Sequence, residues 1–214
     1  YLTQITEDGE LAVLSGSNQY SVSNQVIRGG VKIQKRDLET KDIKAQGSAT
    51  LKDTGFAIIS LNENPVLVEG KLYKKNETVK TIQTGIDGIA TTSADLLPYG
   101  KYKLEETKAP EGYLTDGAKA IEFSITENGK IVDLTDESHS IYNQIKRGDL
   151  EGVKIGAGTH KRLANVTFKI TSKTTGEGHI VVTDKNGQFS TASDWASHKK
   201  NTNAGTSSED GIWF

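Results

Sequence analysis

The chain has 214 residues, of which 34% are hydrophobic and 25% charged, so it is long enough to bury one core or two small ones. Its 26 basic and 28 acidic residues nearly cancel to a formal net charge of -2, which excludes an electrostatic argument for binding nucleic acid or an acidic membrane surface. Cysteine is absent, which excludes disulfides, and no apolar run approaches the roughly 18 residues needed to span a bilayer.

Short segments of alternating apolar and polar residues follow one another along most of the chain, separated by turn signals such as Asp87-Gly88 and Asn128-Gly129. The predicted strands are 31–35, 55–61, 66–68, 78–83, 101–106, 120–125, 130–134 and 140–145. Residues 36–50 and 198–210 are polar enough to form long surface loops. Many short strands with glycine-rich turns predict an all-β protein built as a β-sandwich.

A segment near the start of the chain returns near residue 140. Residues 21–31, SVSNQVIRGGV, reappear at 140–150 as SIYNQIKRGDL, and the same shift carries Lys35 onto Lys154. A unit that recurs at a fixed spacing indicates modules strung in tandem. We therefore expect three modules. They are the closing strands of a preceding module in 1–29, a complete module in 30–148, and the beginning of a third in 149–214.

Three predicted strands carry one polar side chain where the alternation requires a core residue. Residues two apart on a strand share a face, so Lys35, Glu106 and Asn143 each lie in line with two apolar residues that point into the interior. Those apolar pairs are Val31 and Ile33, Tyr102 and Leu104, and Ile141 and Ile145. An amine, a carboxyl and a carboxamide are thus predicted to point inward.

These three groups are the reactants for an amide bond between side chains. A lysine amine is nucleophilic only when neutral, and burial lowers the pKa of an amine while raising that of a carboxyl. A protonated Glu106 can donate to the carboxamide and then to the leaving amine, as a general acid does. Folding supplies the proximity that makes the reaction intramolecular.

Two neighbouring residues compete for these roles. Lys32 lies beside the predicted nucleophile, but it shares a face with Gln34 and not with Val31 and Ile33. Glu105 is excluded by the same alternation, because Glu106 and not Glu105 shares a face with Tyr102 and Leu104.

Residues 102–113, YKLEETKAPEGY, are similar to the E-box segment of the prealbumin-like CnaB or SpaA-type modules of Gram-positive surface adhesins and pilins. Residues 31–37 resemble the first strand of those modules, which carries a reactive lysine, and 141–145 resemble the last strand, which carries an acceptor asparagine. The resemblance covers 30–148 and, in pieces, both flanks. It implies an Ig-like or prealbumin-like β-sandwich, repeated in tandem.

The resemblance also implies a spontaneous intramolecular isopeptide bond. In that family, the lysine amine attacks the asparagine carboxamide, ammonia leaves, and the glutamate carries protons. Here those roles fall on Lys35 as nucleophile, Asn143 as acceptor and Glu106 as proton shuttle. Each molecule reacts once, so we expect self-modification and no enzymatic turnover, and neither a cofactor nor a metal.

The flanks repeat parts of this set. Asn24 is expected to have served as acceptor in the preceding module and to be unreacted here, and Lys154 is a candidate nucleophile of the following module. Arg147-Gly148-Asp149 spells an integrin-type tripeptide, but its repeat copy reads Arg28-Gly29-Gly30, which indicates a joint between modules. The histidines, which show no metal-ligand spacing, are His139, His160, His179 and His198.

We interpret the chain as part of a wall-anchored surface protein of a Gram-positive bacterium, in which tandem modules form a stalk or adhesin shaft. Its partners would be neighbouring modules of the same polypeptide, and the secretion signal and anchor would lie outside these residues. A module that binds a host matrix protein or glycan is the alternative, although 7% aromatic residues offer no obvious sugar platform. A transthyretin-like hydrolase is a third reading, without a nucleophile constellation to support it.

Overall fold

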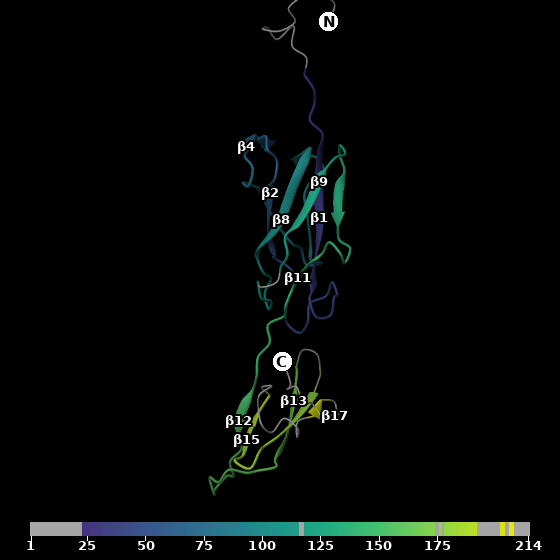
Figure 1. Cartoon of the computed structure of the whole chain (residues 1–214). Helices are drawn as coiled ribbons and strands as arrows, with labels where there is room; N and C mark the ends of the chain where they lie inside the picture. Colours follow the sequence, from purple (N-terminus) through teal and green to yellow (C-terminus); the bar gives the residue numbers. More distant parts are fainter. Residues whose placement is uncertain are drawn as a thin grey trace, which may run out of the picture.

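The computed structural model describes residues 23–115, 118–173, 176 and 178–191, together with the backbone of 202–203 and 206–207. Every regular element within these residues is a β-strand, which confirms the all-β prediction (Figure 1).

The first sheet is organised around β1 (Arg28–Asp37). This strand pairs in parallel with β10 (Ile131–Leu134) along its first half and with β11 (Ile141–Asn143) at its end. It also pairs antiparallel with β6 (Ile89–Thr91) and β7 (Leu97–Pro98). The first strand of the module therefore lies beside the last one, and both run in the same direction.

The second sheet is antiparallel, in the order β5 (Thr78–Gln83), β2 (Gly55–Ser60), β8 (Gly100–Lys108) and β9 (Ile121–Ile125). A separate hairpin is formed by β3 (Val66–Val68) and β4 (Lys71–Tyr73). Figure 1 shows β2, β8 and β9 next to one another, with β1 partly covered by β9.

Apolar side chains from both sheets form one core between them. The buried cluster comprises Val31, Ile33, Phe56, Ile58, Val66, Val68, Val79, Ala90, Leu96, Leu97, Tyr102, Leu104, Phe123, Ile125, Leu134 and Ile141. The Tyr102 ring stacks on Phe123, with centroids 5.8 Å apart, and its hydroxyl donates to the Pro98 carbonyl at 2.9 Å. Two sheets that enclose a shared core make a β-sandwich, as the sequence predicts.

Most predicted strands are confirmed within one or two residues, but β1 is longer than the predicted 31–35. Arg28 and Gly29 pair with β7, and Arg36 and Asp37 pair with β11. The prediction of a surface loop over 36–50 is therefore wrong at its first two residues. The short strands β4, β6 and β7 were not predicted, because two or three residues are too few to show an alternation.

Residues 149–191 contribute further strands. β12 (Glu151–Val153) pairs with β15 (Gln188–Ser190), and β13 (Thr167–Thr171) pairs with β14 (Gly178–Val182). In addition, β16 (Thr202–Asn203) pairs with β14 and with β17 (Thr206–Ser207), so part of the loop predicted at 198–210 is extended backbone. The rest of that predicted loop lies outside the described residues, as does most of the predicted module 1–29.

The backbone of this second region repeats the hydrogen bonds of the first. Lys35 N donates to Gly88 O at 2.8 Å, and Lys154 N donates to Gly187 O at 2.7 Å. Thr92 and Thr191 are a second equivalent pair. The hydroxyl of each threonine accepts from the backbone N–H of one residue near the start of its region, and its own backbone N–H donates to the carbonyl of that same residue. Those residues are Val31 and Leu150. These equivalent positions of the sequence repeat thus share the same backbone hydrogen bonds.

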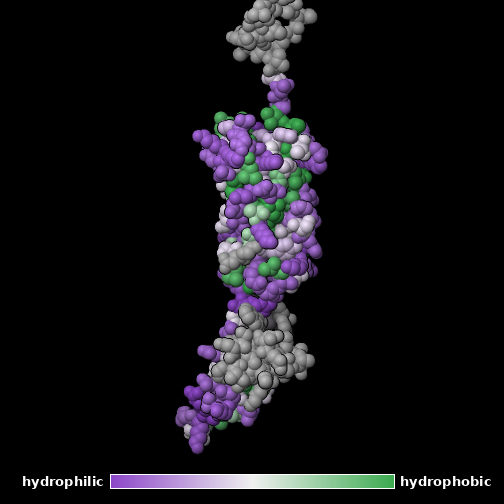
Figure 2. All heavy atoms as spheres, in the orientation of Figure 1, coloured by the Kyte–Doolittle hydropathy of each residue, from purple (hydrophilic) through white to green (hydrophobic). Residues whose placement is uncertain are grey.

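The surface of the visible face is mainly hydrophilic (Figure 2). Apolar areas on that face are small and separate. Large hydrophobic side chains that are exposed within the described residues include Leu67, Leu72 and Tyr99. In the part of the chain that the structure describes, no helix has the length and apolar character to cross a membrane.

Candidate functional site

Lys35, Glu106 and Asn143 converge from three strands of the sandwich. Lys35 lies near the end of β1, Glu106 on β8 and Asn143 at the end of β11. Lys35 and Asn143 have no exposed surface, and the Glu106 side chain is 3% exposed. The predicted inward orientation of all three is confirmed.

Glu106 joins the other two side chains. Its Oε2 lies 3.6 Å from Lys35 Nζ, and its Oε1 accepts a hydrogen bond of 2.9 Å from Asn143 Nδ2. Lys35 Nζ also donates to the Ile141 carbonyl at 2.7 Å, which holds the amine over the acceptor strand. The amine and the carboxamide therefore face the same carboxyl group.

The local backbone aims Glu106 at this position. Phe56 pairs with Glu106, but its neighbour Gly55 pairs with Lys108, so Thr107 is an extra residue on β8. Such a β-bulge redirects the side chains beside it and is frequent next to functional groups. A Cβ on Gly55 would lie 3.1 Å from Thr107 Oγ1, so glycine suits this close approach.

Burial prepares both ionisable groups for the neutral state. Desolvation lowers the pKa of Lys35 from 10.5 to about 8, against the opposing effect of the Glu106 charge. Desolvation also raises the pKa of Glu106, against the opposing effects of Lys35 and of the Asn143 hydrogen bond. Asn143 Oδ1 accepts no hydrogen bond from the described residues, although it is buried.

The two competing residues lie elsewhere. Glu105 is 48% exposed at its side chain and pairs with Lys103 at 3.1 Å on the outside of the sheet. Lys32 is partly buried on the opposite face of β1. The alternation argument therefore selects the buried lysine and the buried glutamate of each neighbouring pair.

Asp37 is a member of this region that the sequence analysis missed. It is fully buried, and it lies directly opposite Asn143 in the parallel register of β1 and β11. Burial acts to raise its pKa, but hydrogen bonds from Thr40, Gln46 and Tyr113 outweigh it and hold the pKa below its ordinary value. The signal that could have found it is its spacing of two from Lys35 on the same strand.

The flanking candidates are not in comparable sites. Asn24 is exposed in an extended segment before β1, and Lys154 is half-buried. Arg147 of the integrin-type tripeptide is engaged by Glu39, with its Nε 3.0 Å from Glu39 Oε1. Hydrogen bonding from Arg147 is the largest of the effects that lower the pKa of Glu39 to about 2. This pair ties the segment after β11 back to the module.

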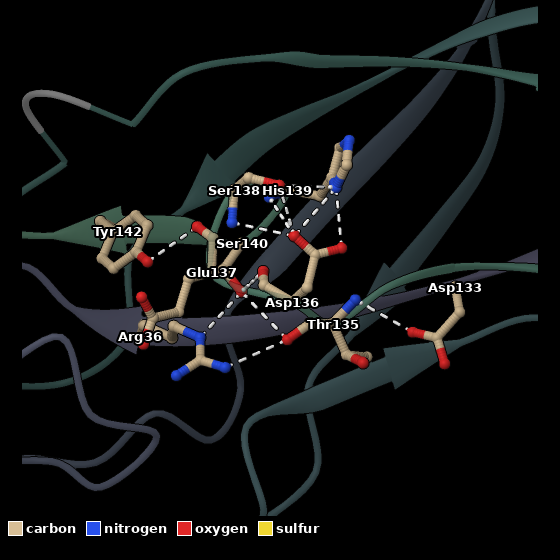
Figure 3. A network of polar contacts seen from close by, with 9 residues as sticks. All are labelled: Arg36, Asp133, Thr135, Asp136, Glu137, Ser138, His139, Ser140 and Tyr142. Carbon is tan, nitrogen blue, oxygen red and sulfur yellow. Dashed lines mark hydrogen bonds and ion pairs between the residues drawn. The ribbon is translucent and has the colours of Figure 1, made fainter.

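A serine, a histidine and an aspartate meet on the turn between β10 and β11, but not as a hydrolytic triad (Figure 3). His139 Nδ1 lies 2.8 Å from Asp136 Oδ2 and 3.1 Å from Ser138 Oγ. A triad needs the carboxylate and the nucleophile at opposite ring nitrogens. Here both meet Nδ1, and Ser138 and His139 also donate their backbone N–H groups to Asp136 Oδ1, which is the pattern of a side-chain-stabilised turn.

The same turn fixes the start of the acceptor strand. Arg36 Nε donates to Ser140 Oγ at 2.9 Å, and its Nη2 donates to the Thr135 carbonyl at 3.1 Å. Tyr142 donates its hydroxyl proton to the Glu137 carbonyl at 2.9 Å. Within the described residues, no cluster of three or more His, Cys, Asp and Glu side chains could hold a metal ion.

Comparisons with known proteins agree with this architecture. The family model "SpaA: Prealbumin-like fold domain" matches residues 30–138, just over half of the chain. The structure of the Bacillus anthracis TIE protein is similar, with a TM-score of 0.50 and 25% identity over 77% of this chain and 26% of that one.

Two pilins show more distant similarity. The Streptococcal ancillary pilin gives a TM-score of 0.39 and 20% identity, covering 78% of this chain and 50% of that one. The major pilin SpaD of Corynebacterium diphtheriae gives a TM-score of 0.39 and 20% identity, covering 72% of this chain and 36% of that one. The chain thus spans half or less of these proteins, and no curated protein matches it. On the family match, the chain belongs to the SpaA family of prealbumin-like fold domains.

Proposed function

We propose that residues 30–148 form a structural module of a Gram-positive surface protein that closes itself with an isopeptide bond between Lys35 and Asn143. The observation that carries this proposal is the convergence of Lys35, Glu106 and Asn143 in a buried site. Membership of the SpaA family supports the structural role.

The reaction balances with the groups of the site alone. The neutral Lys35 Nζ attacks Asn143 Cγ, and Glu106 carries a proton from Nζ to Nδ2. The bond between Nζ and Cγ forms, the bond between Cγ and Nδ2 breaks, and ammonia leaves. Glu106 ends in the state in which it began, so it acts as general acid and base in one turnover.

The fold supplies what this chemistry requires. Burial favours the neutral amine and the protonated carboxyl, as the direction of both pKa shifts indicates. Holding amine and carboxamide against one carboxyl replaces a bimolecular encounter by an intramolecular step, which is worth about 7–11 kcal/mol at best.

The bond would change how the module carries tension. β1 and β11 are parallel neighbours, and the chain enters the sandwich through β1 and leaves it through β11. A bond from Lys35 to Asn143 would pass a pulling force directly from the first strand to the last. Residues between 35 and 143 would then stay folded under load, which suits a stalk at the cell surface.

The flanking regions extend the proposal to a tandem array. The hydrogen bonds that 149–191 share with 31–92 support a following module of the same kind. Neighbouring modules of the same polypeptide would be the partners of 30–148, and the location would be the outside of the cell wall.

Intact-protein mass spectrometry tests the cross-link. We expect the mass of the wild-type chain to fall short of its sequence mass by one ammonia. Glu106→Ala should restore the full mass, whereas the matched variant Glu105→Ala, which alters the exposed neighbour, should keep the deficit. A wild-type mass equal to the sequence mass would contradict the proposal.

A further inference from the structure

We propose that Asp37, together with Tyr113, is a positioning residue for the cross-link, which holds the acceptor strand around Asn143. The proposal rests on the isopeptide bond proposed above and adds two residues to its machinery. Neither touches the reacting atoms. Each acts through the backbone on either side of Asn143.

The Asp37 carboxylate is buried, and each of its oxygens accepts two hydrogen bonds. Its Oδ1 accepts from the backbone N–H of Glu39 at 2.8 Å and of Thr40 at 2.9 Å. Its Oδ2 accepts from Tyr113 Oη at 2.8 Å and from Gln46 Nε2 at 3.0 Å. A carboxylate is removed from water at a large cost unless such partners surround it, so the site is built to hold this charge.

Tyr113 links that carboxylate to the segment after Asn143. Tyr113 forms an isolated antiparallel bridge with Ile145, and Leu114 N donates to Gln144 O at 2.9 Å. On the other side, Leu38 N donates to Asn143 O at 3.0 Å. Leu38, next to Asp37, and Leu114, next to Tyr113, therefore hydrogen-bond to the backbone of the acceptor strand from its two sides. The hydrogen bond between the Asp37 and Tyr113 side chains connects these two contacts.

The repeat shows that the turn after β1 does not need this carboxylate. Gly156 takes the place of Asp37 in the following region, at the same spacing from its lysine. The turn nevertheless keeps its bonds: Gly156 N donates to Lys161 O at 2.8 Å, as Asp37 N donates to Asp42 O at 3.0 Å. Local folding therefore does not explain the buried charge of Asp37, whereas its long-range bond to Tyr113 does.

Positioning and simple electrostatics predict opposite effects of removing this charge. The negative charge of Asp37 raises the pKa of Lys35, so its loss alone would free more neutral amine and speed the reaction. Loss of the anchor would instead misplace the carboxamide, and a displacement of about 1 Å can slow a reaction by about a hundredfold. The direction of the rate change thus separates the two explanations.

The test follows ammonia loss in chains made by a short cell-free pulse and quenched in denaturant at timed intervals. We expect Asp37→Asn and Tyr113→Phe each to slow the reaction by about tenfold or more. Asp42→Asn, which alters an exposed aspartate of the same loop, should react at the wild-type rate. Thermal unfolding of each variant combined with Glu106→Ala verifies that it is folded at the assay temperature.

The outcomes are distinct. If the wild type loses no ammonia, the isopeptide bond itself is absent. If the wild type reacts and both folded variants react as fast or faster, the positioning role is overturned. Should Asp37→Asn fail to fold, Tyr113→Phe alone tests the proposal. This variant keeps the aromatic ring and the negative charge of Asp37, and it removes only the hydroxyl that bonds to that carboxylate.

Discussion

The carboxamide of Asn143 donates a hydrogen bond of 2.9 Å to Glu106 Oε1, so the acceptor of the proposed cross-link is held by the same group that faces Lys35. Asn143 Oδ1 meanwhile accepts no hydrogen bond from the described residues. Buried polar atoms are almost always paired, and a catalytic role is one of the reasons for an exception. The arrangement is that of reactants held together, and it leads to the following predictions.

The rate of cross-linking should depend on pH through both ionisable groups. Burial lowers the pKa of Lys35 to about 8 and raises that of Glu106. The fraction of Lys35 in the neutral form increases with pH up to about 8, whereas the fraction of Glu106 in the protonated form decreases above the pKa of Glu106. The rate should therefore rise with pH on the acid side, level off between the two pKa values, and fall by about tenfold per pH unit once the pH exceeds both of them. Timed quenching and mass spectrometry measure it, and a rate that keeps climbing in alkaline buffer would exclude protonated Glu106 from the mechanism.

Removal of the cross-link should lower the free energy of unfolding. By analogy with disulfides, closing a loop of roughly 100 residues is worth about 4–5 kcal/mol. Lys35→Met keeps an unbranched stem of similar size and removes the nucleophile, so its unfolding free energy should fall by at least that amount. Denaturant titration of both proteins measures the difference, with Lys32→Met as the control on the other face of β1. A loss below about 1 kcal/mol would contradict this contribution of the cross-link to stability.

The hydroxyl of Tyr102 should contribute to the stability of the core. It donates to the Pro98 carbonyl at 2.9 Å inside the sandwich, and Tyr102→Phe would leave that carbonyl unpaired. We expect a loss of about 1–3 kcal/mol in unfolding free energy. Tyr99 is 59% exposed, so Tyr99→Phe is the matched control and should change the stability by less than about 0.5 kcal/mol. Equal effects of the two substitutions would refute the assignment.

Two glycines at equivalent repeat positions should respond differently to alanine. A Cβ on Gly29 would lie 2.7 Å from the Lys130 carbonyl oxygen and 3.0 Å from Ile125, whereas a Cβ on Gly148 would meet nothing within 4 Å. Gly29→Ala should therefore destabilise the module by about 1–3 kcal/mol, and Gly148→Ala by less than about 0.5 kcal/mol. Thermal or denaturant unfolding compares them, and a larger loss at Gly148 would contradict the packing described at Gly29.

Much of the site could be predicted because strand alternation is a local rule. Lys35, Glu106 and Asn143 each share a strand face with apolar residues two positions away, and the rule places them inside without knowledge of the fold. The same alternation was sufficient to predict that Glu106, and not Glu105, points into the core.

Asp37 was not predicted, because its burial depends on distant partners. It begins a polar stretch that is typical of a loop, and only the arrival of Tyr113 and Gln46 makes its burial tolerable. A sequence does not reveal which donors will surround a carboxylate from other segments. The pairing of β1 with β11, which also extends β1 beyond its apolar core, was hidden for the same reason.

Peptide mapping of the purified wild-type chain tests the central claim most directly. After proteolysis, the account predicts one branched peptide that joins the segment containing Lys35 to the segment containing Asn143, lighter by one ammonia than the sum of its two parts. Recovery of both segments as separate, unmodified linear peptides would contradict it.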